Sequence, residues 1–132
     1  MSAGPFRVLL VGCGKMGSAL LAGWIERGFR PEDVAAVEPD PANAEAARRL
    51  GVAVAGDIGR IPDGFVPDMV VIALKPQTTD AGVPAYRPLA EKGAAFLSIA
   101  AGRPIAYFER LLGPSAPVLR APRFWRIMQG RA

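Results

Sequence analysis

A glycine triplet with G-x-G-x-x-G spacing stands near the amino end of this chain and limits the folds open to it. Gly12, Gly14 and Gly17 directly follow the uninterrupted apolar run Val8–Val11. Such a run is typical of a strand buried on both faces of a parallel sheet. Gly12 permits a tight turn, Gly14 leaves room for a pyrophosphate, and Gly17 allows close packing of the next helix.

The residues after the triplet repeat with helical spacing. Met16, Ala19, Leu20, Gly23 and Trp24 follow one another at i, i+3, i+4, i+7 and i+8, and we expect them to share one apolar face. The amino end of this helix offers N–H groups and a positive dipole end to phosphate. Strand, glycine turn and helix therefore come in the order that a dinucleotide site requires.

An acidic residue follows the second apolar run. Val34–Val37 ends at Glu38, 21 residues after Gly17, where a carboxylate that accepts ribose hydroxyls is expected. A carboxylate there repels the additional phosphate of NADPH and favours NADH. The alternative is a glycine-rich turn in an α/β protein that binds nothing.

The length and composition of the chain limit the number of domains and the kinds of site that it can contain. Its 132 residues suit one domain, and its single cysteine excludes an internal disulfide and fits a reducing, cytoplasmic location. Because there is no histidine and only scattered acids, no metal site is expected. We see no signal peptide and no apolar run as long as a membrane span.

Positive charge gathers at the carboxyl end. The net charge of +4 comes from Arg120, Arg123, Arg126 and Arg131, because acidic and basic residues balance before them. No basic face is expected within the folded pattern, so nucleic-acid binding is not predicted.

Apolar runs alternating with helical patterns predict the α/β class, with a doubly wound parallel sheet of Rossmann type in a single domain. Strands are expected at 6–11, 34–38, 52–54, 69–74, 94–99 and from 117, and helices at 16–27, 41–50, within 78–91 and at 104–112. Gly28 is expected to end the first helix, and Asp40 to cap the second with Pro41 at its first position.

The usual strand order of this fold, 3-2-1-4-5-6, places the cofactor crevice between the loops after the first and fourth strands. The glycine turn forms one wall. Lys75, Pro76 and Gln77 follow the fourth strand and form the other. Lys75 is thus predicted to lie near the cofactor, where a cation steadies a phosphate, a ribose or a substrate carboxylate.

Several segments together resemble pyrroline-5-carboxylate reductase. They read VLLVGCGKMGSALLAGW, VEPDP, ALKPQ, SIAAG and PVLRA, and the resemblance extends over residues 6–121. It implies a reductase that uses NADPH or NADH to reduce a cyclic imine, 1-pyrroline-5-carboxylate, to proline. The predicted cofactor-binding residues are Gly12, Cys13, Gly14, Lys15, Met16, Gly17, Glu38, Leu74, Lys75, Pro76, Gln77, Ala100, Ala101 and Gly102.

Three of these residues have a second interpretation. Lys75 is either a residue of the site or a solvated lysine at the end of a strand. Met16 either packs against the cofactor or belongs to the apolar face of the first helix. Cys13 is most simply a small filler within the turn. Ser98 is interpreted as a core hydroxyl, and no catalytic residue is assigned.

The chain departs from the family after residue 121. Where the family continues with Met-Pro-Asn-Thr-Pro, this chain reads Pro-Arg-Phe-Trp-Arg and ends at Ala132. We therefore expect a dinucleotide-binding domain at 1–121, a divergent basic tail at 122–132, and a truncated form without the family's helical dimerisation domain. The alternative function is a dinucleotide-binding module, or a defective fragment, without turnover.

Overall fold

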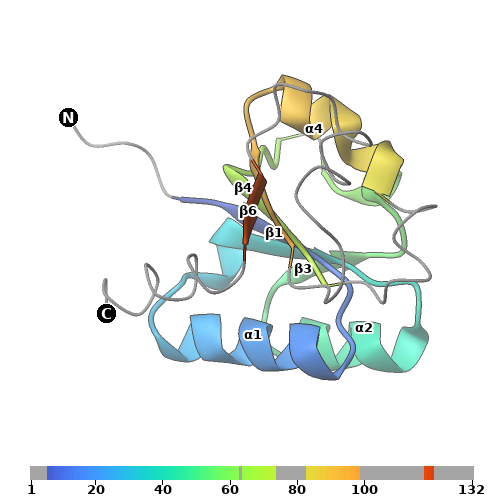
Figure 1. Cartoon of the computed structure of the whole chain (residues 1–132). Helices are drawn as coiled ribbons and strands as arrows, with labels where there is room; N and C mark the ends of the chain where they lie inside the picture. The colour runs from blue at the N-terminus through green and yellow to red at the C-terminus, as the bar shows by residue number, and fades with distance from the viewer. Residues whose placement is uncertain (1–5, 63, 74–82, 99–117, 121–132) are drawn as a thin grey trace.

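The computed structural model describes residues 6–62, 64–73, 83–98 and 118–120. Its strands form one sheet in the order β3-β2-β1-β4-β5-β6, and every pair of neighbours is parallel (Figure 1). The predicted doubly wound sheet is confirmed. The strands are β1 (Val8–Val11), β2 (Val34–Val37), β3 (Ala53–Ala55), β4 (Met69–Ile72), β5 (Ala95–Ser98) and β6 (Val118–Arg120).

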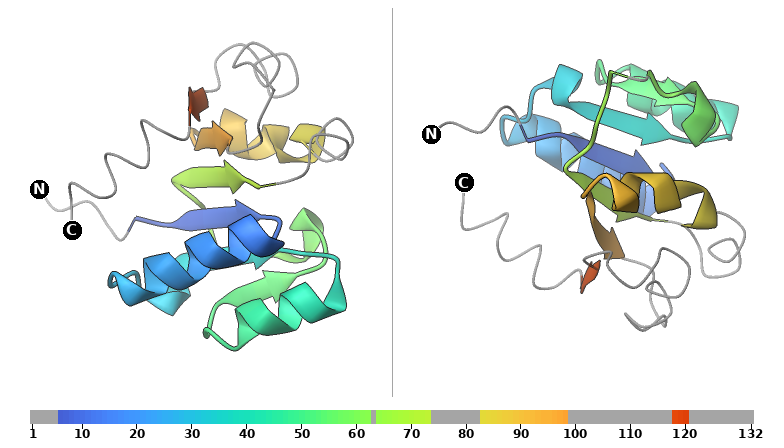
Figure 2. Two further views of the ribbon diagram at one scale, coloured as in Figure 1. Left: turned by 60° about the horizontal axis from the view of Figure 1, so that its bottom comes forward. Right: turned by 90° about the horizontal axis from the view of Figure 1, so that it is seen from above.

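Helices cover both faces of this sheet. Helices α1 (Lys15–Glu26) and α2 (Pro41–Arg48) lie on one face, and α4 (Arg87–Glu91) lies on the other (Figure 2). Short 3-10 helices occur at Pro31–Asp33, Ile58–Arg60 and Val83–Tyr86. The sheet is thus the middle of three layers, as the fold class requires.

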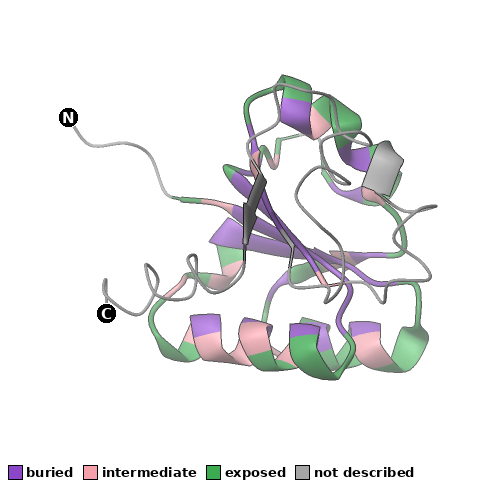
Figure 3. Cartoon of the chain, in the orientation of Figure 1, coloured by how far each residue is buried: buried purple, intermediate pink, exposed green. Residues whose placement is uncertain are grey.

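The central strands are buried on both faces, which explains their unbroken apolar sequences. All four residues of β1 and all four of β4 are buried (Figure 3). Leu9 of β1 packs in the cluster on the α4 side, whereas Leu10 packs in the cluster with α1 and α2. Because successive side chains of a strand point to opposite faces, one short strand supplies both cores.

The buried face of α1 differs from the one that we expected. Its buried residues are Gly17, Leu21 and Trp24, whereas Ala19 is exposed and Met16 keeps 60% of its surface exposed. The helix is turned so that Gly17, the residue without a side chain, faces the turn at the end of β1. The predicted apolar face was therefore wrong by about one position in the helical repeat.

The predicted glycine after α1 and the predicted start of α2 are confirmed, whereas α1 and α2 end one and two residues earlier than expected. Gly28 follows α1 with a φ of 105°, a left-handed conformation that glycine adopts without a steric cost. The side chain of Asp40 accepts a hydrogen bond from the N–H of Asn43 at 3.0 Å, and Pro41 is the first residue of α2. Most strands are one or two residues shorter than expected, and the helix expected at 104–112 lies outside the described residues.

Candidate functional site

The glycine turn lies at the carboxyl edge of the sheet, between the ends of two neighbouring strands. The N–H of Gly12 donates to the carbonyl of Val37 at 2.9 Å, and the N–H of Ala73 donates to the carbonyl of Val11 at 2.8 Å. These bonds join the turn after β1 to the ends of β2 and β4. Gly12 has a φ of 99°, so the turn itself requires glycine.

The other two glycines of the triplet have different surroundings. A Cβ atom built on Gly17 would lie 2.1 Å from the carbonyl oxygen of Gly12, so any side chain there would push α1 away from the turn. A Cβ on Gly14 would meet no atom of the described residues within 4 Å. Gly17 therefore serves the packing of the fold, while Gly14 leaves an open surface beside the helix.

The amino end of α1 suits an anion. Gly14 is its N-cap, no side chain among the described residues accepts a capping hydrogen bond there, and the first turn contains no acidic residue. The first-turn N–H groups of a helix have no partner within the helix, and they carry the positive end of its dipole. Lys15 and Met16 stand exposed beside them. The exposure of Met16 excludes its core interpretation and leaves it free to contact a ligand.

Glu38 makes a connection that the sequence did not predict. It directly follows β2, is only 8% exposed, and its Oε1 accepts a hydrogen bond from the N–H of Cys13 at 2.5 Å. Its Oε2 accepts from the N–H of Asp40 at 2.9 Å. The spacing placed an acid at the predicted edge of the sheet, but it gave no sign of these two backbone contacts.

Cys13 is a filler of the turn and not a reactive group. Its side chain is fully buried in the cluster between the sheet and α1, and its carbonyl accepts a bond from the Ser18 hydroxyl at 2.6 Å. Burial, and then the charge of Glu38, raise the pKa of the Cys13 thiol to about 11. Because the thiolate is the nucleophilic form, this thiol is unreactive near neutral pH.

The second predicted wall of the site is not tested by the structure. Leu74, Lys75, Pro76 and Gln77 lie outside the described residues, and so do Ala100, Ala101 and Gly102. Ala73, the last described residue before them, is positioned by its bond to Val11 beside the glycine turn. The structure thus brings together the six residues of the turn and Glu38, and it leaves the other members of the set as predictions.

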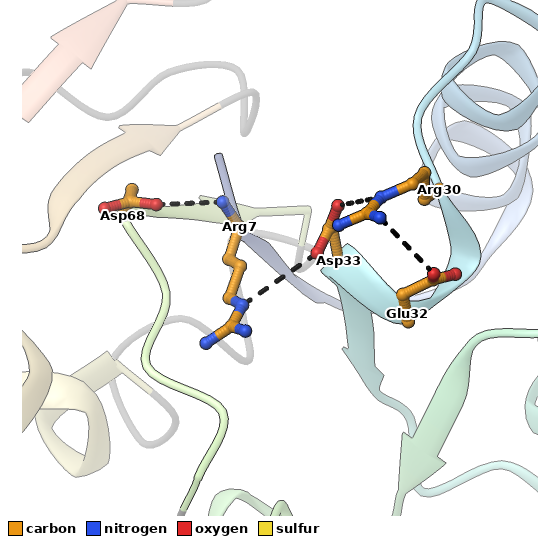
Figure 4. Close-up of polar contacts among 5 residues, drawn as sticks. All are labelled: Arg7, Arg30, Glu32, Asp33 and Asp68. Carbon is orange, nitrogen blue, oxygen red and sulfur yellow. Dashed lines mark hydrogen bonds and ion pairs between the residues drawn. The ribbon is translucent and has the colours of Figure 1, made fainter. Parts of the chain in front are cut away.

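A polar cluster occupies the opposite, amino edge of the sheet (Figure 4). Asp68 accepts a hydrogen bond from the N–H of Arg7 at 2.9 Å, and the buried Asp33 accepts one from Arg30 Nε at 2.9 Å. Arg7 Nε and Asp33 Oδ1 are 3.9 Å apart, and Arg30 also pairs with Glu32 at 3.8 Å. These contacts join residues that precede β1, β2 and β4, so the cluster holds the strands together.

A hollow of about 380 Å³ opens at the same edge, lined in part by Arg7, Glu32 and Phe65. It lies at the end of the sheet away from the glycine turn. In doubly wound sheets, ligands bind outside the carboxyl ends of the strands. We therefore place the candidate site at the glycine turn and not in this hollow.

The described residues contain neither a cluster suited to a metal ion nor a helix suited to a membrane. Across 6–62, 64–73, 83–98 and 118–120, no three acidic or cysteine side chains gather in a way that would hold a metal ion. No helix in these ranges has the length and apolar character needed to cross a bilayer.

This chain is similar to known proteins in sequence and in fold. A family model described as "NADP oxidoreductase coenzyme F420-dependent" matches residues 7–102. Pyrroline-5-carboxylate reductase of Mycobacterium tuberculosis is 33% identical, over 92% of this chain and 42% of its own length. The chain thus spans less than half the length of this curated relative. The predicted resemblance to pyrroline-5-carboxylate reductase is confirmed.

Two solved structures show the same fold. A pyrroline-5-carboxylate reductase from Coxiella burnetii superposes with a TM-score of 0.77, at 21% identity, over 87% of this chain and 43% of the other. Pyrroline carboxylate reductase of Plasmodium falciparum, solved with NADP bound, gives a TM-score of 0.71 at 19% identity, over 87% and 41%. At these identities the structural likeness supports the Rossmann-type fold.

Proposed function

Because this chain belongs to the family described as "NADP oxidoreductase coenzyme F420-dependent", we propose that it binds NADPH or NADH at the glycine turn. We further propose that it acts in the reduction of 1-pyrroline-5-carboxylate to proline. One observation carries the cofactor assignment. The open surface at Gly14 adjoins the uncapped amino end of α1, while Gly17 holds that helix against the turn.

The described residues suit distinct parts of a dinucleotide. The first-turn N–H groups of α1 would receive the pyrophosphate over Gly14, because the dipole and the missing side chain both favour an anion there. Met16 would contact the cofactor with its exposed side chain. Glu38 would accept the hydroxyls of the adenosine ribose, since each carboxylate oxygen has a second acceptor position beyond its backbone bond.

The remaining cofactor contacts are proposed from the sequence alone. Lys75, Pro76 and Gln77 would face the glycine turn across the crevice, and Ala100 to Gly102 would lie near the nicotinamide. The bound cofactor would supply the hydride for the imine carbon, and the protein would supply orientation and electrostatics.

The substrate assignment depends on the named relatives. The curated relatives from Mycobacterium tuberculosis and Pseudomonas aeruginosa, 33% and 31% identical, are both pyrroline-5-carboxylate reductases. This chain spans only 42% and 41% of their lengths, and we propose that the shared part is the one that binds the cofactor. A cytoplasmic location stays a prediction.

A second candidate is a dinucleotide-binding module without turnover. It is favoured by the described residues of the site, to which we assign proposed cofactor contacts and no substrate contact. Hydride transfer requires both reactants held near contact distance with water excluded. A chain that supplies only one side of such a crevice would bind cofactor without reducing the imine.

Two measurements on the purified chain test these proposals together. Calorimetry with NADPH and with NADH reports binding, and loss of reduced-nicotinamide absorbance with 1-pyrroline-5-carboxylate reports turnover. Binding with proline formation supports the reductase, and binding alone supports the module. A folded chain that binds neither dinucleotide refutes the cofactor site.

A further inference from the structure

We propose that Glu38 is a positioning residue that fixes the shape of the glycine turn before any cofactor arrives. As a ribose acceptor, Glu38 would act only on the ligand. In the structure its carboxylate already bridges two backbone turns, and this role is independent of a ligand. Its consequence for cofactor affinity rests on the proposed function.

The bridge joins segments that are distant in the sequence. Cys13 belongs to the turn after β1, and Asp40 belongs to the turn after β2; each donates its N–H to a different oxygen of Glu38, at 2.5 and 2.9 Å. The parallel pairing of Val11 with Val37 brings the ends of these strands side by side. The carboxylate therefore ties the β1–α1 turn to the β2–α2 turn.

The two N–H groups also explain how a carboxylate is tolerated at 8% exposure. A buried charge is costly unless hydrogen bonds or an opposite charge compensate it. No ion pair of Glu38 occurs among the residues with described positions. Hydrogen bonds from backbone N–H groups to a carboxylate are charge-assisted and are stronger than neutral ones. Backbone donors from both turns thus stabilise the carboxylate, and the carboxylate in turn holds both turns.

Glu38 is itself held from the rest of the sheet. Its own N–H donates to the carbonyl of Ala55 at the end of β3 at 2.8 Å. The Cys13 carbonyl is fixed at the same time by the Ser18 hydroxyl. The peptide units on both sides of Cys13 are therefore fixed by side chains, and so is the approach of the chain to Gly14.

This anchoring predicts a binding pattern that ribose contact alone does not. If Glu38 only accepted ribose hydroxyls and repelled a 2′-phosphate, its neutralisation would weaken NADH and strengthen NADPH. If Glu38 also shapes the turn that receives the pyrophosphate, its loss weakens both, because the pyrophosphate is common to both dinucleotides. The carboxylate also cannot swing away from a 2′-phosphate without releasing both turns.

The matched variants are Glu38→Gln and Glu32→Gln. A glutamine at position 38 keeps the size, but its amide group has one acceptor oxygen and directs a donor at one of the two N–H groups. Glu32 lies at the opposite edge of the sheet, and 67% of its side chain is exposed. Glu32→Gln therefore also removes one negative charge, but at a position distant from the glycine turn. Amide hydrogen exchange is measured by NMR on the full chain without cofactor. We expect at least tenfold faster exchange at Cys13 or Asp40 in Glu38→Gln, and no change there in Glu32→Gln.

Two further readouts make the test complete. In the unaltered chain, a through-hydrogen-bond coupling should connect the Cys13 amide nitrogen to the Glu38 carboxylate carbon, and this holds even if the variant does not fold. In calorimetry, Glu38→Gln should bind both NADH and NADPH at least tenfold more weakly. An absent coupling or unchanged exchange in Glu38→Gln overturns the positioning role, and tighter NADPH binding in Glu38→Gln overturns its proposed consequence for cofactor affinity. An unaltered chain that binds neither dinucleotide refutes the proposed function instead, and the cofactor-free measurements still decide the role of Glu38.

Discussion

Replacement of Gly14 by valine separates cofactor binding from folding. Gly14 is exposed, has a φ of −67° that any residue adopts, and offers a Cβ no contact within 4 Å. The isopropyl group would therefore fit the protein, but it would occupy the space above the first-turn N–H groups of α1. Those groups must come within about 3 Å of phosphate oxygens to bind them.

The substitution should lower cofactor affinity much more than it lowers the stability of the fold. A hydrogen bond to a charged group contributes about 1.5–3 kcal/mol, so the loss of one phosphate contact should weaken NADH and NADPH binding roughly 10- to 150-fold. Valine is a poorer N-cap than glycine by less than about 1 kcal/mol. This lowers Tm by roughly 6 °C at most for a chain of 132 residues.

Calorimetric titration with each dinucleotide is the assay, with thermal unfolding of the same samples as the check on folding. Gly23→Val is the matched control, because Gly23 lies within α1 and its Cβ also meets nothing within 4 Å. That variant should bind both dinucleotides as the unaltered chain does. A folded Gly14→Val protein whose affinity for both stays within twofold would refute the placement of the pyrophosphate.

Three further predictions concern the fold around the site. Gly17→Ala should lower the free energy of unfolding by about 1–3 kcal/mol in urea denaturation, because the new Cβ would overlap the Gly12 carbonyl. A decrease of less than about 0.5 kcal/mol, which is roughly the noise of such data, would contradict this close approach. Asp40→Ala should cost about 1 kcal/mol by the same measurement, since it removes the N-cap bond to Asn43, and an unchanged value would show that this cap contributes nothing. The Cys13 thiol has a pKa of about 11 in the folded chain, above its ordinary value of 9.0, so the unfolded chain releases the proton first and the contribution of Cys13 to stability is lost as pH rises from about 9 through about 11. Urea denaturation across this range should show a steeper fall for the unaltered chain than for Cys13→Ala, and equal slopes would exclude the raised pKa.

Sheet order could be predicted from the sequence because local patterns determine it strongly. The unbroken apolar runs at β1 and β4 have no polar face to leave in water, so they belong in the centre of a parallel sheet. The glycine spacing then identified the turn after the first strand as the candidate dinucleotide turn. The rotation of α1 was harder, because Leu20, Leu21 and Ile25 extend its apolar character around most of the helix. Two overlapping faces of the helix were apolar enough to pack on the sheet. The close approach of Gly17 to the turn determines which of them is buried.

The role of Glu38 shows where sequence reasoning ends at this site. The spacing between the glycine turn and Glu38 predicts that this acid lies at the end of the second strand, because the length of a strand–helix–strand unit is nearly fixed. Which donors that acid meets depends on three-dimensional register. Val11 lies opposite Val37, so the peptide after Gly12 comes within reach of a side chain that starts one residue beyond Val37. Glutamate is long enough to bond Cys13 and still return to the N–H of Asp40, and both bonds are made within the protein. A motif defined by its ligand assigns the carboxylate to the ribose alone, whereas the structure gives the same carboxylate a function in the fold. A substitution at this position would therefore change the turn and the proposed ribose contact together. Cofactor affinities alone would not separate the two effects, whereas amide exchange of the cofactor-free chain reports on the turn alone.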